Sequence, residues 1–417
     1  MILSDRERGI LSGATGPEGA RMAMEIVVET ARMMGADRLV PIVSSHIDGC
    51  LYHGDAGVLF CERLAEEGAR VAVPATTNVG SLNLLKADQV KLPEAQRGMA
   101  LRLMTAHRRI GCTPTWTCAP YQTQARPALG QQIAWGESNA VAFANTVLGA
   151  RTNRYGDFLD LACAIAGRAP YYGLHCPENR SARLLFEVSG LSEALLREDA
   201  FFAVLGALVG RYAGDAVSVV DGIPGPVQED RLKSFCAAAA ATGAVALTHI
   251  VGVTPEAPDA ATALGGTPPE ETVRVSRDMI VEARDRLSLA GPGPIDCVSL
   301  GSPHFSGDEC RAVLALAGGR KFRVPVYICL GRHTLDGLQE DGAHDALQGL
   351  GVEFVVDTCV VVTAILPPRP GVMMTNSAKF AYYSFGNTGY EPVFGTLSDC
   401  IRSAQAGEVV RDREIWG

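Results

Sequence analysis

Three short apolar runs in the second half of the chain decide the fold: IDCVSL at residues 295–300, VPVYICL at 324–330 and GVEFVV at 351–356. Each run has the length and composition of a buried strand, and segments with the apolar spacing of amphipathic helices separate them. The first half shows the same alternation, with a helical pattern over 19–34 before the apolar run RLVPIV at 38–43. Strands that alternate with helices are typical of α/β proteins with largely parallel sheets. The sequence therefore predicts the α/β fold class.

The length of the chain predicts more than one domain. A chain of 417 residues is long enough for two or three. We expect a boundary near residues 212–216, which divides the chain into 1–215 and 216–417. The stretch 252–269, which is rich in Pro, Ala, Thr and Gly, is the alternative position for it.

Charge and cysteine content narrow the classes of function. The 37 basic residues are outnumbered by 46 acidic ones, which argues against nucleic acid as the main partner. Residues 5–8 are all charged where a signal peptide needs an apolar region, and twelve cysteines without such a signal predict reduced thiols in the cytoplasm. The most apolar stretch, 235–253, has the pattern of a helix followed by a strand, so we expect no membrane span.

Polar side chains gather just after the predicted strands. In parallel sheets the carboxyl ends of the strands form the edge where ligands bind. One such cluster is often only turn chemistry, but several at the same topological position favour a shared enzyme site. The clusters are Ser45, His46 and Asp48; Thr76, Thr77 and Asn78; Thr117 and Cys118; Ser302 and His304; Arg332 and His333; Asp357 and Cys359; and Thr375, Asn376, Ser377 and Lys379.

Several common catalytic motifs are missing from the sequence. It has no P-loop, no G-x-G-x-x-G after a strand, no G-x-S-x-G, no C-x-x-C and no H-E-x-x-H. Two cysteines stand out instead, because Cys118 in TWTCAPY and Cys359 in VVDTCVVVT have polar neighbours rather than an aliphatic run. The other cysteines fit the ordinary role of small buried apolar side chains.

Eight longer motifs, spread over most of the chain, allow a comparison with known families. They are SSHIDG (44–49), PATTN (74–78), TWTCAPYQ (115–122), WGESNAVAFANTVLGARTNR (135–154), GRAPYYGLH (167–175), LGSPHFS (300–306), DTCVVVT (357–363) and TNSAKFAYY (375–383). In these motifs the chain resembles the aconitase X family. The resemblance implies a multi-lobed aconitase-like core, an iron–sulfur cluster and the dehydration of small hydroxy acids.

The resemblance also implies a set of cluster ligands. We expect Cys118 and Cys359 to bind iron, with Ser302 at the third position, where some family members have a cysteine. Because a serine oxygen is a harder and rarer iron ligand than a thiolate, we favour a 2Fe–2S cluster over a 3Fe–4S cluster. Cys112 is an alternative third ligand, although its place at a strand start favours core packing.

Catalytic roles follow from what an elimination of water requires. Expelling hydroxide requires help at the leaving oxygen, and His46 is the candidate to orient it, with a structural role as the equal alternative. Lys379 and Arg151 are candidates to hold a carboxylate, and Asp48 and Glu137 to face an amine. We expect the remaining lining to come from Ser45, Thr77, Asn78, Ser138 and Asn139.

The resemblance places the catalytic base on a second polypeptide. It implies that this chain is the large subunit, that the closing swivel domain lies in a small subunit, and that a serine of that subunit is the base. The predicted reaction is dehydration of cis-3-hydroxy-L-proline to Δ1-pyrroline-2-carboxylate. The alternatives are the large subunit of a mevalonate 5-phosphate dehydratase, and a noncatalytic metal-binding partner.

Overall fold

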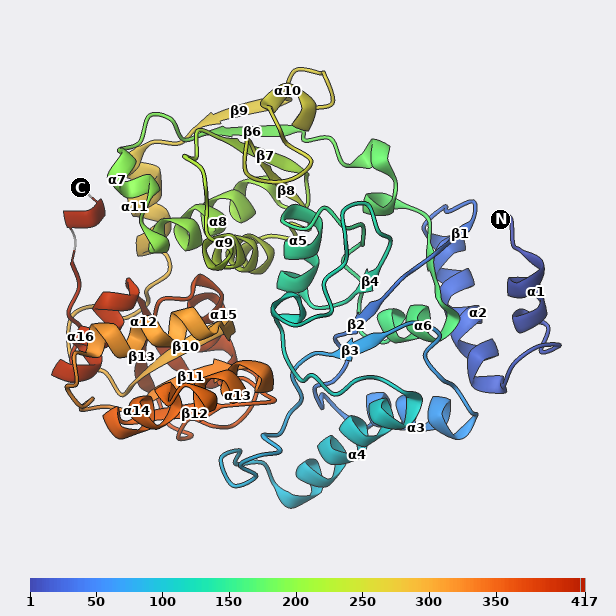
Figure 1. Cartoon of the computed structure of the whole chain (residues 1–417), viewed down its shortest axis with the longest axis horizontal. Helices are drawn as coiled ribbons and strands as arrows, with labels where there is room; N and C mark the ends of the chain where they lie inside the picture. Colours follow the sequence, from blue (N-terminus) through green and yellow to red (C-terminus); the bar gives the residue numbers. More distant parts are fainter. Residues whose placement is uncertain (413, 417) are drawn as a thin grey trace. The chain divides into compact units, whose positions relative to one another are not determined.

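The computed structural model describes residues 1–412 and 414–416, and these fold into two compact units, Met1–Arg180 and Ser181–Gly417 (Figure 1). The division lies ahead of the predicted boundary between residues 215 and 216. The reason is tertiary: the strand at Leu184–Glu187 (β6) pairs with the strand at Ser218–Asp221 (β7), and the helices on either side of β7 pack together. These contacts place residues 181–215 with the second unit.

The first unit holds a small parallel sheet and a separate antiparallel pair of strands. The sheet has the order β3-β2-β4, and β1 pairs with β5. Its elements are α1 (Asp5–Leu11), α2 (Glu18–Met33), β1 (Leu39–Pro41), β2 (Ser45–Ile47), α3 (Asp55–Glu66), β3 (Ala75–Thr77), α4 (Glu94–Ile110), η1 (Pro120–Gln122), β4 (Ala134–Trp135), α5 (Ser138–Thr146), α6 (Leu159–Ala166), β5 (Arg168–Pro170), η2 (Gly173–His175) and η3 (Pro177–Asn179).

The first unit corrects one detail of the sequence prediction. Ser45 and His46 lie within β2 and Thr76 and Thr77 within β3, rather than after a strand. The apolar run at 38–43 forms only the short strand β1, which pairs with β5, so the parallel sheet begins several residues later than predicted. The polar side chains are therefore part of the strands themselves.

The second unit begins with a four-stranded parallel sheet in the order β8-β7-β6-β9. The helices α8 and α9 pack against each other beside it (Figure 1). The elements of this part are β6, α7 (Glu193–Leu196), α8 (Asp199–Ala213), β7, α9 (Glu229–Thr242), β8 (Thr248–Ile250), α10 (Ala260–Ala263), β9 (Glu271–Arg274) and α11 (Arg277–Asp285).

A five-stranded parallel sheet completes the second unit, and it confirms the predicted α/β class. Its order is β12-β11-β10-β13-β14, so the chain runs outward from β10 in both directions. Such a reversal of strand order leaves a crevice at the carboxyl ends of the two central strands. The elements are β10 (Cys297–Phe305), α12 (Gly307–Ala317), β11 (Val326–Leu330), α13 (Arg332–Glu340), α14 (Ala343–Leu350), β12 (Val352–Val355), β13 (Gly371–Thr375), α15 (Ala378–Thr388), β14 (Tyr390–Phe394), α16 (Leu397–Ala406) and η4 (Glu414–Trp416).

The middle strand β10 is irregular at the residues that the sequence analysis singled out. Its pairing with β11 shifts register between Leu300 and Phe305. Gly301 lies in this shift with a φ of +89°, and a Cβ there would come within 2.1 Å of the Cys329 carbonyl oxygen. Only glycine therefore fits between the two strands, and the segment that carries Ser302 leaves the regular ladder at this point.

Candidate functional site

The predicted site residues are divided between the two units. His46, Asp48, Asn78, Cys118, Glu137 and Arg151 belong to the first, and Ser302, Cys359 and Lys379 to the second. Within residues 1–412 and 414–416, no group of three or more His, Cys, Asp and Glu side chains is arranged to hold a metal ion. Each half is therefore described by itself.

His46 in β2 is a neutral histidine with one open ring nitrogen. Its side chain is fully buried, and Nδ1 lies 2.8 Å from the Thr76 hydroxyl. Nε2 is buried without a hydrogen-bond partner among the described residues. Burial lowers the pKa of His46 to about 4, although the nearby charge of Glu137 opposes this shift. A buried nitrogen without a protein partner is costly unless a water molecule or a ligand satisfies it, so Nε2 is available to a bound molecule.

Two further histidines of the first unit also have a lowered pKa, like His46. Burial lowers the pKa of His107 to about 4 and that of His175 to about 3. All three histidines bind a proton more weakly in the folded chain than in the unfolded chain, where their pKa is about 6.5. The folded state therefore has its full stability above pH 6.5 and loses stability as the pH falls towards 4.

At pH 5.5 each of the three neutral histidines lowers the free energy of unfolding by roughly 1 kcal/mol. Burial raises the pKa of Asp160 well above its ordinary value, so its protonation stabilises the folded chain as the pH falls and offsets part of this loss. We expect the urea midpoint of this unit to fall between pH 7.5 and 5.5, because three histidines oppose one carboxyl group. The fluorescence of Trp116 and Trp135 during urea unfolding measures this midpoint.

A single substitution tests the cause of this pH dependence. His107 contacts the Leu103 carbonyl in its own helix and the Cys61 thiol, neither of which is a predicted site residue. In a Trp416→Phe background, which removes the tryptophan of the second unit, His107→Leu should reduce the loss of stability between pH 7.5 and 5.5 by roughly 1 kcal/mol, the contribution of one of the three histidines. A pH dependence of the midpoint that His107→Leu leaves unchanged would assign the effect to other groups.

The loop of Cys118 is held by residues that the sequence analysis had assigned to the substrate. The Thr77 hydroxyl accepts from the Trp116 backbone N–H at 3.1 Å, and the Thr77 carbonyl accepts from the Thr117 N–H at 3.1 Å. Trp116 itself has a left-handed φ of +43°, which is unfavourable for a bulky residue. Thr77 thus anchors a strained loop and places Cys118, which is 6% exposed, at its end.

Glu137 and Asn139 hold the same loop from the start of α5. The Glu137 carboxylate caps this helix by accepting from the Ala140 N–H at 2.7 Å, and it also accepts from the Asn139 amide at 2.5 Å. The Asn139 amide donates to the Cys118 carbonyl at 2.6 Å as well. These contacts give Glu137 a capping role, which stabilises a helix by about 1 kcal/mol. Its catalytic role stays a prediction.

The other predicted polar residues of the first unit bond to one another and to the backbone, and two of them have a buried atom without a partner. Asn78 donates to the Asp48 carboxylate, and the Asp48 N–H donates to the Asp160 carboxylate at 2.6 Å. The Ser45 hydroxyl donates to the Ala134 carbonyl at 2.6 Å, so it serves the sheet. Asn78 Oδ1 and Arg151 Nε are buried without hydrogen-bond partners. With His46 Nε2, three predicted site residues therefore hold unsatisfied polar atoms. The Ser138 hydroxyl donates to the Glu137 carboxylate at 3.4 Å.

Cys359 in the second unit has the character of a metal-binding thiol. It is buried, yet its pKa lies below the ordinary value. The main cause is a hydrogen bond from the Cys329 side chain, and the charge of Lys379 and a hydrogen bond from Ser302 act in the same direction against burial. Because the thiolate is the form that binds metal, this environment suits a ligand. Ser302, Cys359 and Lys379 therefore lie together.

The turn before Cys359 is strained and held by an arginine. Asp357 has a left-handed φ of +65° and is fully buried. Arg332, at the start of α13, donates to both Asp357 carboxylate oxygens at 2.7 Å. On the other side of Ser302, the Ser377 hydroxyl donates to the Ser302 carbonyl. Bidentate pairing of this kind is specific in geometry, so it fixes the turn that presents the thiol.

Cys329 is the residue of this half that sequence reasoning missed. It is the second-to-last residue of the apolar run VPVYICL, and every residue of β11 is buried, so its surroundings in the sequence are those of a core residue. Its place near the end of β11, beside the strand that leads to Cys359, brings the two thiols together. The only signal in the sequence was that position near the end of a strand.

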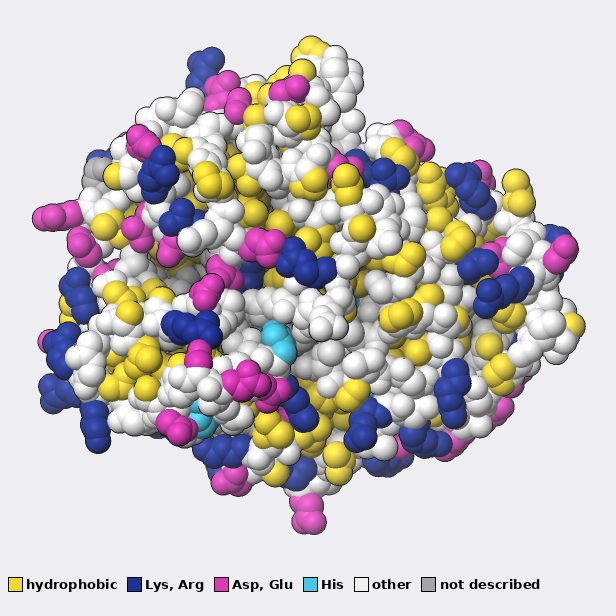
Figure 2. Space-filling model, viewed as in Figure 1, with side chains coloured by type: hydrophobic (Ala, Val, Ile, Leu, Met, Phe, Trp, Pro, Cys, Tyr) yellow, Lys and Arg dark blue, Asp and Glu magenta, His cyan; other side chains and the backbone are white. Residues whose placement is uncertain are grey.

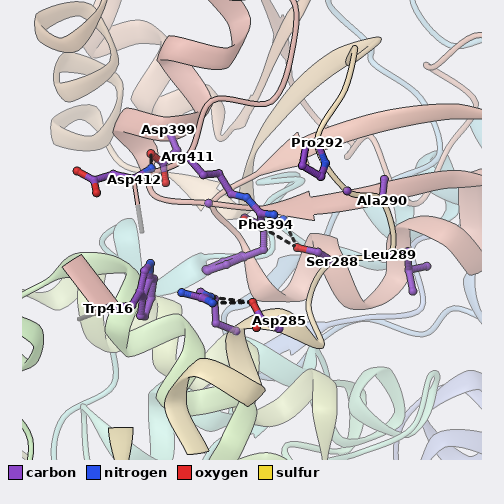
Figure 3. A pocket seen from close by; sticks show the side chains of 13 residues that line it. Asp285, Ser288, Leu289, Ala290, Pro292, Phe394, Asp399, Arg411, Asp412 and Trp416 are labelled. Atoms are coloured by element: carbon purple, nitrogen blue, oxygen red, sulfur yellow. Dashed lines mark hydrogen bonds and ion pairs between the residues drawn. The ribbon is translucent and has the colours of Figure 1, made fainter. Parts of the chain in front are cut away.

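A cavity of about 380 Å³ lies elsewhere in the second unit and contains none of the predicted residues (Figure 3). Arg284, Phe394, Arg411 and Trp416 are among the residues that line it. Arg284 is paired with Asp285 at 2.7 Å, and Arg411 donates to the Phe394 carbonyl at 3.2 Å. Since both cations are bound by the chain itself, we do not assign the substrate to this cavity.

The surface gives no sign of a basic track on the face seen in Figure 2, where acidic and basic side chains are interspersed. The described helices also include none with the length and apolar character needed to cross a bilayer.

Three consecutive segments of the chain match models of known protein domains. Residues 1–178 match the model of the aconitase X first domain, 182–285 the second domain and 295–406 the third domain. These three matches define a three-domain protein of the aconitase superfamily type.

Individual relatives extend the similarity over almost the whole chain. The cis-3-hydroxy-L-proline dehydratase of Pseudomonas aeruginosa is 40% identical over 98% of this chain and 71% of its own length. The phosphomevalonate dehydratase large subunit of Methanothermobacter thermautotrophicus is 35% identical over 96% of this chain and 98% of its own length. The crystal structure of Thermococcus kodakaraensis aconitase X in its holo form superposes with a TM-score of 0.86 at 32% identity, covering 97% of this chain and all of that one. The chain belongs to the aconitase X family.

Proposed function

We propose that this protein is a dehydratase, a hydro-lyase that converts cis-3-hydroxy-L-proline to Δ1-pyrroline-2-carboxylate. The observation that carries the proposal is the 40% identity to cis-3-hydroxy-L-proline dehydratases from two organisms, Pseudomonas aeruginosa and Hypocrea jecorina, over 97–98% of this chain. The unsatisfied buried atoms of His46, Asn78 and Arg151 support it, because they offer a small polar substrate one acceptor and two nitrogen atoms.

The proposed cofactor is an iron–sulfur cluster held by Cys118 and Cys359, with Ser302 at the third position and 2Fe–2S as the favoured type. The donor set fits such a group, because Cys359 has a lowered thiol pKa with a hydroxyl and a second thiol beside it. When bound, the cluster would supply a Lewis-acidic iron that assists departure of the hydroxyl group.

The chain's own side chains bind and orient the substrate in this proposal. Lys379 and Arg151 hold the carboxylate, and Asp48, held in place by Asn78, faces the ring amine. The neutral His46 places its open nitrogen at the leaving oxygen. Loss of the proton from C2 and of hydroxide from C3 gives an enamine, which becomes the imine product by moving a proton from nitrogen to carbon. A serine of a small subunit is the proposed base.

The second candidate function is that of a phosphomevalonate dehydratase large subunit. It is supported by the 35% identity to the Methanothermobacter subunit, which extends over 96% of this chain. A phosphate requires several cations or a nest of backbone N–H groups. Among the predicted site residues of the first unit, Arg151 is the one cation, and its Nε is buried without a partner. We therefore place this function second. We propose a cytoplasmic location for either, since all twelve cysteines are free thiols.

Assay of the chain with and without a co-expressed small subunit tests the function and the partner together. We expect robust loss of cis-3-hydroxy-L-proline only with the second polypeptide, a domain of roughly 130–170 residues, since closure of the site excludes water. Mevalonate 5-phosphate serves as the matched substrate. Turnover of that compound alone would establish the second candidate, and full activity of the isolated chain would place the base in this polypeptide.

A further inference from the structure

A buried lysine on α9 reaches the strand that carries Ser302. Lys233 is 2% exposed, whereas lysine is rarely buried unless it is paired. Its Nζ lies 2.8 Å from an Asp230 oxygen, pairs with Glu309, and donates to the His304 carbonyl at 3.3 Å. These contacts use the three donors of the ammonium group. The His304 backbone is therefore held by a fixed cation.

Burial does not discharge this lysine. Burial by itself lowers the pKa of Lys233, but the facing carboxylates of Glu309 and Asp230 raise it above its ordinary value. The Phe305 ring also lies 5.9 Å from Nζ. The ammonium group thus stays charged and strongly hydrogen-bonded.

The ring of His304 extends this contact to the Cys359 turn. Its side chain is fully buried, and Nε2 lies 3.2 Å from the Thr358 carbonyl oxygen. A carbonyl oxygen only accepts, so Nε2 carries the proton and donates it. Thr358 directly precedes Cys359. Lys233 therefore holds the backbone carbonyl of His304, and the ring of His304 holds Thr358, the neighbour of Cys359.

The Cys359 turn needs such anchors. Asp357 has a left-handed conformation, which is unfavourable for a residue other than glycine, and a turn of this kind persists only where its surroundings determine it. The Arg332 pair is one anchor, and His304 provides another from β10. Residue 233 belongs to the second family domain, whereas residues 304 and 359 belong to the third, so this contact also joins the two domains.

We infer that Lys233 is a positioning residue for Cys359: it fixes His304, whose ring holds the Thr358 carbonyl beside the thiol. The inference deepens the proposed function, because it rests on Cys359 being a cluster ligand. No ligand role is assigned to Lys233 itself.

The test uses the metal-free full chain and the variant Lys233→Met, which keeps the apolar stem without the ammonium group. Alkylation by iodoacetamide is followed for each cysteine peptide by mass spectrometry. We expect Cys359 to react at least about 10-fold faster than in the wild type, with Cys400, which is fully buried in α16, as the unchanged internal reference. After anaerobic reconstitution, cluster absorbance per chain should be several-fold lower.

Two further variants separate positioning from a loss of stability. Leu347→Ala removes a buried side chain of α14, and it should lower the melting temperature without accelerating Cys359 alkylation. Glu309→Gln keeps an acceptor for Lys233 but removes the charge, so it should give an intermediate acceleration even if Lys233→Met fails to fold. Equal acceleration in Leu347→Ala at the same loss of melting temperature, or none in Lys233→Met and Glu309→Gln, would overturn the inference. Alkylation needs neither cluster nor substrate. An inactive wild type would therefore contradict the proposed function but not the positioning role of Lys233.

Discussion

Cys359→Ala is expected to abolish the visible absorbance of the proposed iron–sulfur cluster, and dehydratase activity with it, while the chain stays folded. A methyl group cannot replace a thiolate as a ligand, and the lowered thiol pKa of Cys359 indicates that this side chain supplies the thiolate. The turn itself should survive, because Arg332 and His304 hold it through Asp357 and Thr358. The measurement is the visible spectrum and iron content of anaerobically purified protein.

Cys118→Ala should have the same effect on the spectrum, because it removes the other proposed thiolate ligand. The chain should stay folded, since Thr77 and Asn139 anchor the Cys118 loop through its backbone. Cys400→Ala is the control, since Cys400 is also a buried thiol but belongs to the core of the five-stranded sheet. A wild-type spectrum in both ligand variants would remove the cluster assignment. Loss of the spectrum in Cys400→Ala would show that the measurement reports general destabilisation.

Lys379→Ala is expected to lower turnover about 100-fold or more while the cluster spectrum is kept. Lys379 lies at the start of α15, and its charge helps lower the pKa of the Cys359 thiol, so it is close to the proposed ligand. An ammonium group that holds a carboxylate near the reacting carbon contributes to binding and orientation together. Steady-state kinetics with cis-3-hydroxy-L-proline measure the effect.

Two lysine variants make this result specific. Lys379→Met keeps the apolar stem and should be as impaired as the alanine variant. Lys321→Ala removes an exposed lysine of the same unit and should leave the kinetics unchanged. Wild-type kinetics for Lys379→Ala would show that the substrate carboxylate is held elsewhere, with Arg151 as the remaining candidate.

Local patterns were sufficient for the fold class and for the family. Apolar runs of strand length between amphipathic helices indicate an α/β protein. A helix that buries one face shows apolar residues every three to four positions, and a parallel strand buried on both faces is a continuous apolar run. Cys118 and Cys359 could be recognised for a similar reason, since polar neighbours distinguish them from the cysteines within apolar runs.

Residue type alone did not separate a substrate contact from a structural one. Thr77 and Glu137 have the chemistry of a binding site, yet their hydrogen bonds hold the Cys118 loop and the first turn of α5. Ser, Thr, Asn, Asp and Glu satisfy backbone groups with the same oxygens that would bind a ligand. Only the positions of their partners distinguish the two roles.

Tertiary structure decided the remaining features. The contact of Cys329 with Cys359 joins a strand end to a distant turn, and the bond of Lys233 to His304 spans about seventy residues of sequence. The division of the units at residue 180 depends likewise on the pairing of β6 with β7. The sequence by itself determined which segments become strands and helices and which family they form, because periodicity is a local property. It did not determine which side chains meet, because such contacts depend on strand order and register, and these arise only when the whole chain packs.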